Sequence, residues 1–410
     1  MKVCIVGGGG REHALAAACA RERADVVVTP GNAGIPWSTL IPPEGLAADL
    51  FIIGPERPLV DGLADRLRAQ GKLVFGPGAD GARLEGSKAW MKEIVKIAGV
   101  DTARYATFTD PMKAKKALGT IGDLFVIKTD GLADGKGVLV TSDRAEAEDA
   151  VDRYLDGSAF GSAGRRLVIE EGLTGPELSV LAICDGKTAV ALPAARDYKR
   201  LGDGNTGPNT GGMGTYSPVP DAPKGIEDLV IEKMVEPTLA ALRRRGIDYR
   251  GVLYAGLMLT PEGPKLLEYN VRFGDPEAQA VLPRIEQGLV DTLRSAARGR
   301  MDTRPVIGSD SVVCVVVAAP GYPTAPQMGV PVTGIEAAQA TPNACVFAAG
   351  VKHAPNDTSL VTAGGRVVNV CGNGPTLDAA RTAAYAAATE IAIPEGIYRT
   401  DIAAPPAAGL

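Results

Sequence analysis

Short apolar runs and segments with helical spacing alternate through the first hundred residues. The apolar runs predict strands, which span Lys2–Val6, Asp25–Thr29, Leu50–Ile53 and Lys72–Phe75. The segments with helical spacing predict helices over Arg11–Arg21, Leu59–Gln70 and Ser87–Ala98. Strands that alternate with helices are typical of a parallel sheet with helices on both faces. We therefore expect an N-terminal parallel α/β domain over residues 1–99.

From residue 100 onward the pattern becomes α+β. Predicted strands cover Leu124–Lys128, Val138–Thr141, Arg166–Glu171, Glu177–Cys184 and Gly251–Leu259, and predicted helices cover Arg144–Leu155 and Asp228–Arg245. The segment Lys199–Ser217 is rich in Gly, Asn and Thr and predicts a long polar loop. Such a loop inside a compact domain is usually functional or disordered. We expect a central domain over residues 100–305.

A smaller α+β unit over residues 306–410 is predicted by two apolar strands and one helix. The strands span Ser311–Ala319 and Arg366–Val370, and the helix spans Thr376–Ala392. The Ala- and Pro-rich end, Ala403–Gly409, predicts a disordered terminus. Three domains agree with a length of 410 residues, which is too long for one ordinary core.

Composition and charge exclude several classes of protein. With 45% hydrophobic and 22% charged residues, the chain has the composition of a soluble globular protein. The net charge is −5 and no basic block is longer than Arg243–Arg245, so we expect no nucleic-acid partner. No apolar stretch is long enough to span a membrane, and the first strand begins without the longer apolar region of a signal peptide. Six scattered cysteines without a Cys-x-x-Cys pair, and only two histidines, predict a cytoplasmic protein without a zinc site.

The most informative segment follows the apolar run Lys265–Leu267, which predicts a strand. Side chains alternate between the faces of a strand, so we expect Glu268, Asn270 and Arg272 on one face. Leu267 and the intervening residues are expected on the other face. Carboxylate and amide oxygens suit Mg²⁺ beside nucleotide phosphates, and a guanidinium suits the charge of a transferred phosphoryl group. The alternative is a strand edge that carries a surface salt bridge.

A second candidate is Lys128, which ends an apolar strand and precedes a glycine-rich loop. The loop contains Gly131, Gly135, Lys136 and Gly137. Glycines allow a loop to fold closely over phosphates, and a lysine can pair with phosphate oxygens. A plain hairpin turn would explain the glycines but not a lysine after four apolar residues, so we predict phosphate binding.

A third candidate is the turn Gly7–Gly10, which lies between the first predicted strand and the first predicted helix. Such a turn exposes backbone N–H groups at a helix N-terminus, where a phosphate can bind. A dinucleotide is not expected, because the third glycine of that fingerprint would fall at Glu12 and no acid ends the strand Asp25–Thr29. The turn therefore predicts a site for a simpler phosphate, and the alternative is a tight structural turn.

These motifs, in this order, resemble the ATP-grasp superfamily and, within it, the phosphoribosylamine–glycine ligases, also called glycinamide ribonucleotide synthetases. The resemblance covers nearly the whole chain. Its carriers are Gly9 with Arg11–Leu15, Pro30–Gly34, Gly54–Glu56 with Pro58–Val60, Glu85–Lys88, Lys128–Ala133 with Gly135–Val138, Asp203–Gly204 with Thr206–Gly214, and Arg272–Glu277. The most specific of these is the Gly-Pro-Asn-Thr-Gly-Gly-Met-Gly loop, residues 207–214.

The resemblance implies an N-terminal domain that binds phosphoribosylamine, an ATP-grasp domain with a lid over about Leu124–Leu192, and a small C-terminal domain. ATP would be bound by Lys88, Lys128, Gly131, Gly135, Lys136, Gly137, Glu170, Glu171, Leu173 and Glu177. Mg²⁺ or Mn²⁺ would be held by Glu268 and Asn270.

The resemblance also implies a place for each of the other substrates. 5-Phosphoribosylamine would be bound by Gly9, Gly10, Arg11, Asn32, Pro55 and Glu56. Glycine would be bordered by Asp197, Lys199, Pro208, Asn209, Thr210, Gly211, Gly212, Met213 and Arg272. The implied catalytic residues are Arg272, Lys128 and Asp197. Two positions depart from the pattern: Tyr198 stands where many relatives carry histidine, and residues 254–258 lack the second metal carboxylate of several ATP-grasp enzymes.

The implied reaction joins glycine to 5-phosphoribosylamine with ATP, through a glycyl phosphate, and forms glycinamide ribonucleotide, ADP and phosphate in de novo purine biosynthesis. We expect a monomeric enzyme whose partners are these three small molecules. Two alternatives stay open: another ATP-grasp carboxylate–amine ligase with different substrates, and a non-catalytic nucleotide-binding regulator. The regulator would have lost Lys128 or one of the residues Glu268, Asn270 and Arg272, and all four are present.

Overall fold

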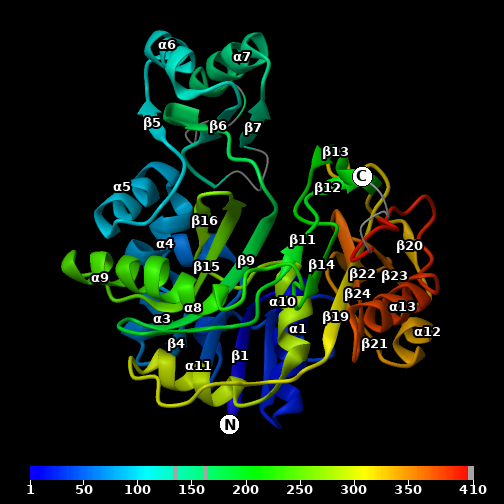
Figure 1. Ribbon diagram of the computed structural model, residues 1–410. Helices are drawn as coiled ribbons and strands as arrows, with labels where there is room; N and C mark the ends of the chain where they lie inside the picture. Colours follow the sequence, from blue (N-terminus) through cyan, green and yellow to red (C-terminus); the bar gives the residue numbers. More distant parts are fainter. Residues whose placement is uncertain (133–136, 158, 160–163, 405–410) are drawn as a thin grey trace.

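The computed structural model describes residues 1–132, 137–157, 159 and 164–404, and its N-terminal part contains the predicted parallel sheet (Figure 1). The strand order is β2-β1-β3-β4, and each neighbouring pair is parallel. The four strands lie where the apolar runs predicted them. They are β1 (Lys2–Gly7), β2 (Asp25–Pro30), β3 (Leu50–Ile53) and β4 (Val74–Phe75).

Helices cover both faces of this sheet, as the alternating pattern predicted. One face, which includes Ile5, packs against α1 (Gly10–Arg21). The other face, which includes Cys4, packs against α2 (Glu56–Val60) and α3 (Leu63–Ala69). Because both faces of each strand are buried, the strands read as continuous apolar runs in the sequence.

The helix predicted over Leu59–Gln70 is two helices in the structure, so that prediction is wrong. Gly62 adopts a left-handed conformation with φ of 76°, which interrupts the helical backbone between α2 and α3. The next helices are α4 (Ala79–Gly86), which was not predicted, and α5 (Lys88–Ala98), which was. Ser87 caps α5, because its side chain accepts a hydrogen bond from the N–H of the third helical residue at 3.1 Å.

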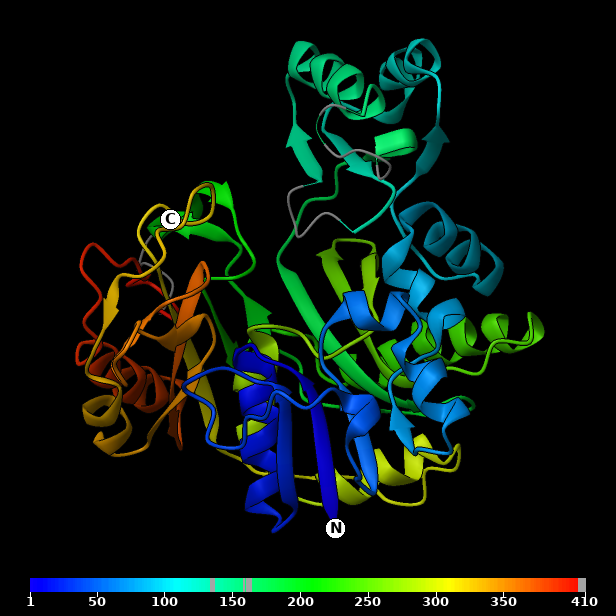
Figure 2. The ribbon, with the colours of Figure 1, turned by 180° about the vertical axis from the view of Figure 1, so that it is seen from behind.

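A small unit projects from the rest of the molecule in two opposite views (Figures 1 and 2). Its sheet has the order β5-β8-β6-β7, and two helices pack on it around a separate apolar core. We call this unit the lid. Its elements are β5 (Tyr105–Phe108), α6 (Pro111–Ile121), β6 (Phe125–Thr129), β7 (Val138–Thr141), α7 (Arg144–Leu155) and β8 (Leu167–Glu171).

The central sheet is antiparallel and has the order β10-β9-β15-β16. Its strands are β9 (Glu177–Asp185), β10 (Ala189–Ala191), β15 (Arg250–Thr260) and β16 (Gly263–Asn270). The helix predicted over Asp228–Arg245 is present, but a π-helical turn divides it. The helical segments of this region are α8 (Ile226–Val230), the π-helical turn (Ile231–Val235), α9 (Glu236–Arg244), α10 (Glu277–Val281) and α11 (Leu289–Ala297).

The five-stranded sheet of the C-terminal part has the order β11-β14-β19-β24-β21 and joins two distant parts of the chain. Its strands are β11 (Arg196–Asp197), β14 (Gly214–Ser217), β19 (Ser311–Ala318), β21 (Ala344–Ala348) and β24 (Arg366–Gly374). The prediction that Lys199–Ser217 is only a loop is wrong, because this segment contains β14 and the hairpin of β12 (Arg200–Gly202) and β13 (Thr206–Asn209). The pairing of β14 with β19 is a long-range contact that the local sequence does not reveal.

The described residues also form several further elements. They are β17 (Ile285–Gln287), β18 (Val306–Ile307), β20 (Pro331–Val332), α12 (Ile335–Ala340), β22 (Val351–His353), β23 (Leu360–Thr362), α13 (Leu377–Ala388) and 3₁₀ turns at Pro43–Gly45, Asp203–Asn205 and Leu282–Arg284. Within the described parts of the chain, no helix combines the length and the apolar character needed to cross a membrane.

The last described residues hold the β12–β13 hairpin in place. Arg399 is 1% exposed, and its guanidinium donates two hydrogen bonds to the Asp401 carboxylate, at 2.7 and 2.6 Å. The same guanidinium donates to the Arg200 carbonyl and to Asn205 Oδ1, both at 3.0 Å. It also stacks on the Tyr198 ring, 4.6 Å from the ring centre. The buried Arg399 therefore joins the last described residues to the segment that contains Tyr198, Arg200 and Asn205.

Replacing Arg399 with alanine should lower the free energy of unfolding by about 2–3 kcal/mol, because the Arg200 carbonyl and Asp401 lose a charged donor. Urea denaturation followed by circular dichroism measures the change. Arg57→Ala, at an exposed arginine of α2, is the matched control and should change this free energy by less than about 0.5 kcal/mol. Equal effects of the two substitutions would contradict a stabilising role for Arg399.

Candidate active site

A cavity of about 1300 Å³ is lined by residues of the central sheet, the lid and the N- and C-terminal parts of the chain. The predicted site residues that line it are Arg11, Glu56, Lys88, Lys128, Gly131, Gly137, Glu170, Glu171, Leu173, Glu177, Asp197, Lys199, Asn209, Thr210, Gly211, Glu268, Asn270 and Arg272. The predicted residues that do not line it are Gly9, Gly10, Asn32, Pro55, Pro208, Gly212 and Met213. Gly135 and Lys136 lie outside the described residues.

One wall of the cavity is β16 and the residues after it, which carry Glu268, Asn270 and Arg272. A β-bulge separates the pairs that Leu266 and Glu268 make with β15, so Leu267 has no partner on that strand. As a result Leu266 lies in the core, and Leu267 lines the cavity. The prediction that Leu267 lies on the opposite face is wrong, because a bulge shifts the alternation and is not visible in the residue pattern.

Glu268 is the acidic centre of a group of cations. The cations that act on its carboxylate are Lys128, Lys199, Lys88 and Arg272. Burial alone would raise the pKa of Glu268, but these cations hold it below its usual range. Glu268 is therefore ionised at neutral pH and offsets part of the repulsion among the positive charges.

Lys128 reaches the cavity from β6 and pairs with Glu170 of β8, with 3.1 Å between Nζ and Oε1. Lys92 of α5 is fully buried and lies 3.1 Å from the same oxygen. Lys92 also donates a hydrogen bond to Thr102 Oγ1 at 2.7 Å. Burial lowers the pKa of Lys92 to about 8, although Glu170 opposes this effect. Glu170, which was predicted to line an adenine pocket, is thus the counter-ion of two lysines.

Lys88 is the first residue of α5 and contacts the loop that follows β6. Its Nζ donates to the Gly131 carbonyl at 2.9 Å. Asp130 holds the same junction, because it accepts hydrogen bonds from Ser87 Oγ at 2.8 Å and from the Ala89 N–H at 3.1 Å. Burial lowers the pKa of Lys88. Lys88 therefore lies in the cavity beside the described end of the glycine-rich loop.

Asp197 and Lys199 lie where β11 ends, and Lys199 forms an ion pair with Glu177. Burial raises the pKa of Asp197 to about 7; Lys199 opposes this effect, whereas Glu277 and Glu177 add to it. Burial alone would lower the pKa of Lys199, but Asp197, Glu177 and Glu268 outweigh this effect and raise it. The pair therefore supplies a firmly charged amine beside a carboxyl group that titrates near neutrality.

Arg272 is held by two carboxylates of the N-terminal part. Its Nε lies 3.2 Å from Glu56 Oε2, and its Nη2 lies 2.9 Å from Glu85 Oε1. Nη2 also donates to Asn270 Oδ1 at 3.3 Å. Burial raises the pKa of Glu85, whereas Arg272 and Arg11 outweigh burial at Glu56 and lower its pKa. The guanidinium therefore has a fixed orientation on the wall of the cavity.

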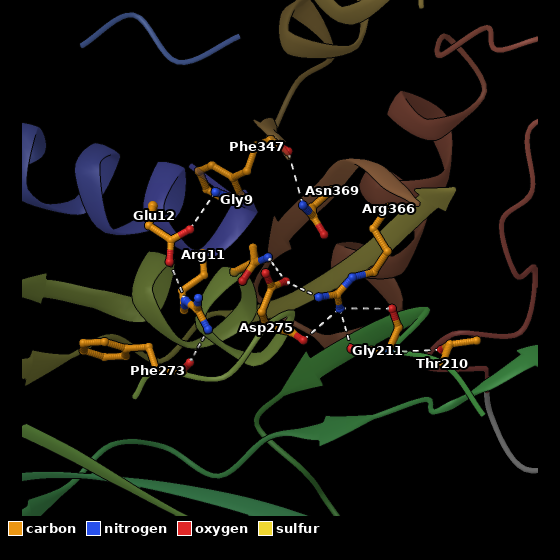
Figure 3. Close-up of polar contacts among 12 residues, drawn as sticks. Gly9, Arg11, Glu12, Thr210, Gly211, Phe273, Asp275, Phe347, Arg366 and Asn369 are labelled. Carbon is orange, nitrogen blue, oxygen red and sulfur yellow. Dashed lines mark hydrogen bonds and ion pairs between the residues drawn. The ribbon is translucent and has the colours of Figure 1, made fainter. Parts of the chain in front are cut away.

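Arg366 of β24 holds the glycine-rich loop that follows β13 (Figure 3). Its Nη1 donates to the carbonyls of Gly211 and Asp275, the latter at 2.8 Å, and its Nη2 lies 3.4 Å from Asp275 Oδ1. On the other side of the loop, Thr210 Oγ1 donates to the Lys199 carbonyl at 2.8 Å. The loop is therefore ordered by contacts from the C-terminal sheet as well as from its own neighbours.

The other predicted residues of this loop have different surroundings. Met213 is fully buried, and its N–H donates to the Tyr198 carbonyl at 2.8 Å, so its side chain is packed in the core. Pro208 is exposed on β13. Gly212 has φ of 107°, and a Cβ there would lie 2.5 Å from Pro276 Cδ.

The predicted turn before α1 is present, and the N–H group of Gly9 already donates a hydrogen bond within the protein (Figure 3). The Gly9 N–H donates to Glu12 Oε2 at 2.6 Å, and Glu12 Oε1 accepts from Arg11 Nε at 2.6 Å. Arg11 also donates to the Phe273 carbonyl at 3.2 Å. Arg11, the second residue of α1, lines the cavity, whereas Gly7–Gly10 do not.

Close packing surrounds the remaining predicted residues near α1. A Cβ at Gly10 would lie 2.1 Å from Asn369 Nδ2, so only glycine fits there without movement. The Asn32 amide donates to the carbonyls of Gly8 and Ala349, both at 2.9 Å, and so joins the N- and C-terminal parts. Pro55 is the residue before the first turn of α2.

Several residues of the site were not predicted from the sequence. Glu85, Asp275 and Glu277 lie within the motifs that carry the resemblance, and Glu277 Oε1 accepts a hydrogen bond from a buried tyrosine at 2.8 Å. These three residues could therefore have been predicted from the motifs. Arg366 is the first residue of β24, a mostly apolar strand of the C-terminal sheet, and no local pattern distinguishes it.

Glu268 and Asn270 fit a hard divalent cation, because they place an ionised carboxylate and an amide oxygen on one wall of the cavity. Among the residues that the structure describes, no group of three or more His, Cys, Asp or Glu side chains could hold a metal ion. A cation at this wall would therefore need further oxygen ligands from a bound substrate, such as the phosphates of a nucleotide.

Sequence profiles of one family match most of the chain. The phosphoribosylglycinamide synthetase N domain matches residues 1–85, the ATP-grasp (A) domain matches residues 86–278, and the C domain matches residues 312–405. The chain belongs to the phosphoribosylglycinamide synthetase family. The family resemblance inferred from the motifs is thereby confirmed.

Relatives and solved structures agree with this family. Proteins named phosphoribosylamine–glycine ligase from Caulobacter vibrioides and Streptomyces coelicolor are 45% and 44% identical, over 98% of this chain and 97% and 99% of theirs. The crystal structure of phosphoribosylamine–glycine ligase from Thermotoga maritima has a TM-score of 0.88 and 37% identity, over 98% of this chain and 100% of that one. Biotin carboxylase from Campylobacter jejuni shares the fold, with a TM-score of 0.71 at 14% identity over 98% of this chain and 94% of that one. The predicted fold class is confirmed.

Replacing Asp197 with asparagine should change how stability depends on pH. The carboxyl group ionises near pH 7 in the folded protein but near pH 4 when unfolded, so the wild type loses stability as the pH rises between these values. Asp197→Asn lacks this loss, so its free energy of unfolding should rise relative to the wild type from pH 4 to pH 7 and remain level above pH 7. Urea denaturation at a series of pH values measures the difference. A constant difference across that range would contradict a raised pKa at Asp197.

Proposed function

We propose that the chain catalyses the ATP-dependent ligation of glycine to 5-phosphoribosylamine, which gives glycinamide ribonucleotide, ADP and phosphate in de novo purine biosynthesis. The observation that carries this proposal is a single cavity in which cations, among them Lys128 and Arg272, surround the oxygen ligands Glu268 and Asn270. Membership in the phosphoribosylglycinamide synthetase family supports it, as do full-length relatives named phosphoribosylamine–glycine ligase.

In this proposal ATP lies between the lid and the central sheet. Lys88 and Lys128 neutralise its phosphates, because both amines already lie in the cavity with neutral or acidic oxygens as partners. Gly131 and Gly137, which flank the glycine-rich segment after β6, line the cavity and lie beside the phosphates in this proposal. Glu171 and Leu173 border the adenine, and Glu177 holds the ribose from the first position of β9.

ATP-grasp enzymes use ATP together with a divalent metal ion, and one structure that shares the fold, a biotin carboxylase domain from Hydrogenobacter thermophilus, was solved with MgADP. We assign Mg²⁺ or Mn²⁺ to Glu268 and Asn270, whose oxygens fit such an ion. When bound, the ion neutralises charge on the transferred phosphoryl group. The ionised state of Glu268 supports this assignment.

The chemistry requires glycine to be activated, because a carboxylate is a poor electrophile. A glycine carboxylate oxygen attacks the γ-phosphorus of ATP, ADP leaves, and glycyl phosphate forms. The amine of phosphoribosylamine then attacks the carbonyl carbon, and phosphate leaves. We assign Arg272 and Lys199 to the negative charge that develops on the phosphoryl and carbonyl oxygens. Asp197, whose pKa of about 7 suits a general base, accepts the proton that the amine loses.

Phosphoribosylamine is assigned to the N-terminal edge of the cavity. Arg11 lies in the first turn of α1, at the positive end of the helix dipole, and adds a formal charge in the cavity. Glu56, with Pro55 before it, opens α2 on the same side and suits the hydroxyl groups of a ribose. Glycine then lies between the two larger substrates, beside Arg272 and the Thr210–Gly211 loop.

An acyl phosphate is hydrolysed by water, so the intermediate must be enclosed. We assign this task to the lid, which spans Tyr105–Glu171. The predicted lid segment of about Leu124–Leu192 overlaps this unit but also includes β9 and β10, which belong to the central sheet. We also propose a monomer in the cytoplasm, and a division into domains of residues 1–99, 100–305 and 306–410. The family matches at residues 1–85, 86–278 and 312–405 support this division.

Purified protein with ATP, Mg²⁺, glycine and freshly prepared 5-phosphoribosylamine should form glycinamide ribonucleotide, ADP and phosphate in equal amounts. Mass spectrometry of the product and a phosphate-release assay measure the reaction. Omission of any one substrate should stop product formation. Turnover with another acid or amine, but not with glycine and 5-phosphoribosylamine, would show that the protein is a different carboxylate–amine ligase. Absence of ATP turnover with every acceptor would instead favour a nucleotide-binding regulator.

Two substitutions should separate the two substrate sites. Lys128→Ala should weaken ATP binding by about tenfold or more, because it removes a cation from the phosphates. Arg11→Gln should raise the KM for phosphoribosylamine by a similar factor and change ATP affinity by less than about twofold. Calorimetry with ATP and steady-state kinetics measure these effects, with the exposed Lys187→Ala as the control. If Arg11→Gln weakens ATP binding alone, the two sites are assigned the wrong way round.

A further inference from the structure

Three cysteines lie side by side on the C-terminal sheet. Cys314 of β19 pairs with Cys371 of β24, and Cys371 pairs in turn with Cys345 of β21. Directly paired residues of neighbouring strands point to the same face, so the three thiols form one row across three strands. We call these residues the thiol row. The row packs in the core that includes α1 and α10, where Cys314 and Cys371 are buried and Cys345 is half-buried.

The hydrogen-bond pattern sets the spacing within the thiol row. The Asn373 N–H donates to the Asn343 carbonyl at 2.8 Å, and this pattern recurs at every second pair, so Cys345 and Cys371 are a hydrogen-bonded pair. On its other edge, Cys371 forms a non-hydrogen-bonded pair with Cys314. The Cα atoms of these two kinds of pair are about 5.5 and about 4.5 Å apart, and both distances lie within the range of disulfides. Side chains are closer in the second kind, so the Cys314–Cys371 bond is the less strained one.

The three thiols differ in reactivity. Cys371, beside Cys345, lowers the pKa of the Cys345 thiol; burial opposes this effect, and the nearby Arg21 lowers the pKa further. Burial raises the pKa of Cys371 well above its usual range. A thiol reacts with an oxidant as its thiolate and only where the oxidant can reach it. Cys345 is therefore the member of the row that an oxidant meets first.

We propose that the thiol row is a redox relay, in which Cys345 reacts with a hydroperoxide and the buried pair Cys314 and Cys371 ends as a disulfide. With hydrogen peroxide, the Cys345 sulfur takes one oxygen to form a sulfenic acid, and water is released. The Cys371 sulfur then attacks the Cys345 sulfur and displaces a second water, which forms a Cys345–Cys371 disulfide.

The third step is thiol–disulfide exchange. The Cys314 sulfur attacks Cys371, the Cys345 sulfur leaves, and the proton of Cys314 passes to Cys345. Overall, two thiols are oxidised to one disulfide and one hydrogen peroxide is reduced to two waters. Exchange requires the attacking, central and leaving sulfurs to lie nearly in line. A row across three adjacent strands provides that arrangement with Cys371 in the centre.

The buried end of the relay contacts a helix that follows the candidate active site. The Cys371 thiol donates a hydrogen bond to the Gln279 carbonyl at 3.4 Å, and the Gln279 side chain donates to Asp275 Oδ1 at 2.8 Å. Disulfide formation removes the thiol proton, so the Gln279 carbonyl loses this donor. The oxidation state of the row is thus linked to the placement of α10.

The proposal is tested on the folded, full-length protein with hydrogen peroxide. After treatment, the protein is quenched in acid, its remaining thiols are blocked with N-ethylmaleimide under denaturing conditions, and its peptides are mapped by mass spectrometry. We expect a peptide pair linked through Cys314 and Cys371, with Cys345 recovered as a blocked thiol. The buried Cys4 and Cys184 are internal controls and should remain reduced. Over-oxidation of Cys345 without any link to Cys371 would overturn the relay.

Two variants separate the steps. Cys345→Ser should slow formation of the Cys314–Cys371 disulfide by about tenfold or more, because the accessible thiol is lost. Cys314→Ala should stop the relay at a Cys345–Cys371 disulfide. Cys4→Ala is the matched control and should leave the product unchanged, and thermal melting identifies any variant that is unfolded. An unchanged rate in Cys345→Ser, or no Cys345–Cys371 disulfide in folded Cys314→Ala, would refute the proposal.

Discussion

The candidate active site depends on holding several positive charges close together in a partly buried cavity. Two like unit charges about 4 Å apart repel by roughly 4 kcal/mol in such surroundings. The structure offsets this cost by giving each cation an acidic or carbonyl partner: Glu170 pairs with Lys128, and Glu56 and Glu85 hold Arg272. Lys128, Lys199, Lys88 and Arg272 act together on Glu268 and hold its pKa low in spite of burial. The positive charge that phosphates require is therefore assembled before any phosphate binds.

The same arrangement explains why the site is built from distant parts of the chain. Arg272 follows β16, whereas its carboxylate partners come from α2 and α4 of the N-terminal part. Arg366 of the C-terminal sheet donates hydrogen bonds to Gly211, in the loop after β13, and to Asp275. A change in how these parts pack would therefore alter the charge balance of the cavity even if no residue of the cavity changed.

Much of this architecture is visible in the sequence, because its strongest signals are local. The parallel sheet follows from continuous apolar runs, and Lys128 and Glu268 stand out as charged residues at the ends of such runs. The features that escaped prediction depend on pairing or packing at long range. The bulge at Leu267 and the pairing of β14 with β19 are set by neighbouring strands, and Arg366 gains its role only because its strand lies beside the loop. The break of the helix at Gly62 could have been predicted from the sequence, because a glycine inside a predicted helix lowers the helix propensity.

Two lysines contribute to the contacts between the lid and the body, and one of them, Lys128, is proposed to bind the nucleotide. Lys128 extends from the lid and donates to the Leu267 carbonyl of the central sheet at 3.2 Å, while Lys92 of α5 pairs with Glu170 of the lid. In the proposed assignment, a phosphate oxygen at Lys128 would compete with both the carbonyl and the carboxylate for the same amine. Nucleotide binding would then exchange contacts that hold the lid for contacts that hold the ligand. Because the exchanged partners are charged and the cavity is partly buried, a small movement of the lid would change their interaction energy strongly. The affinity for the nucleotide would therefore depend on the position of the lid.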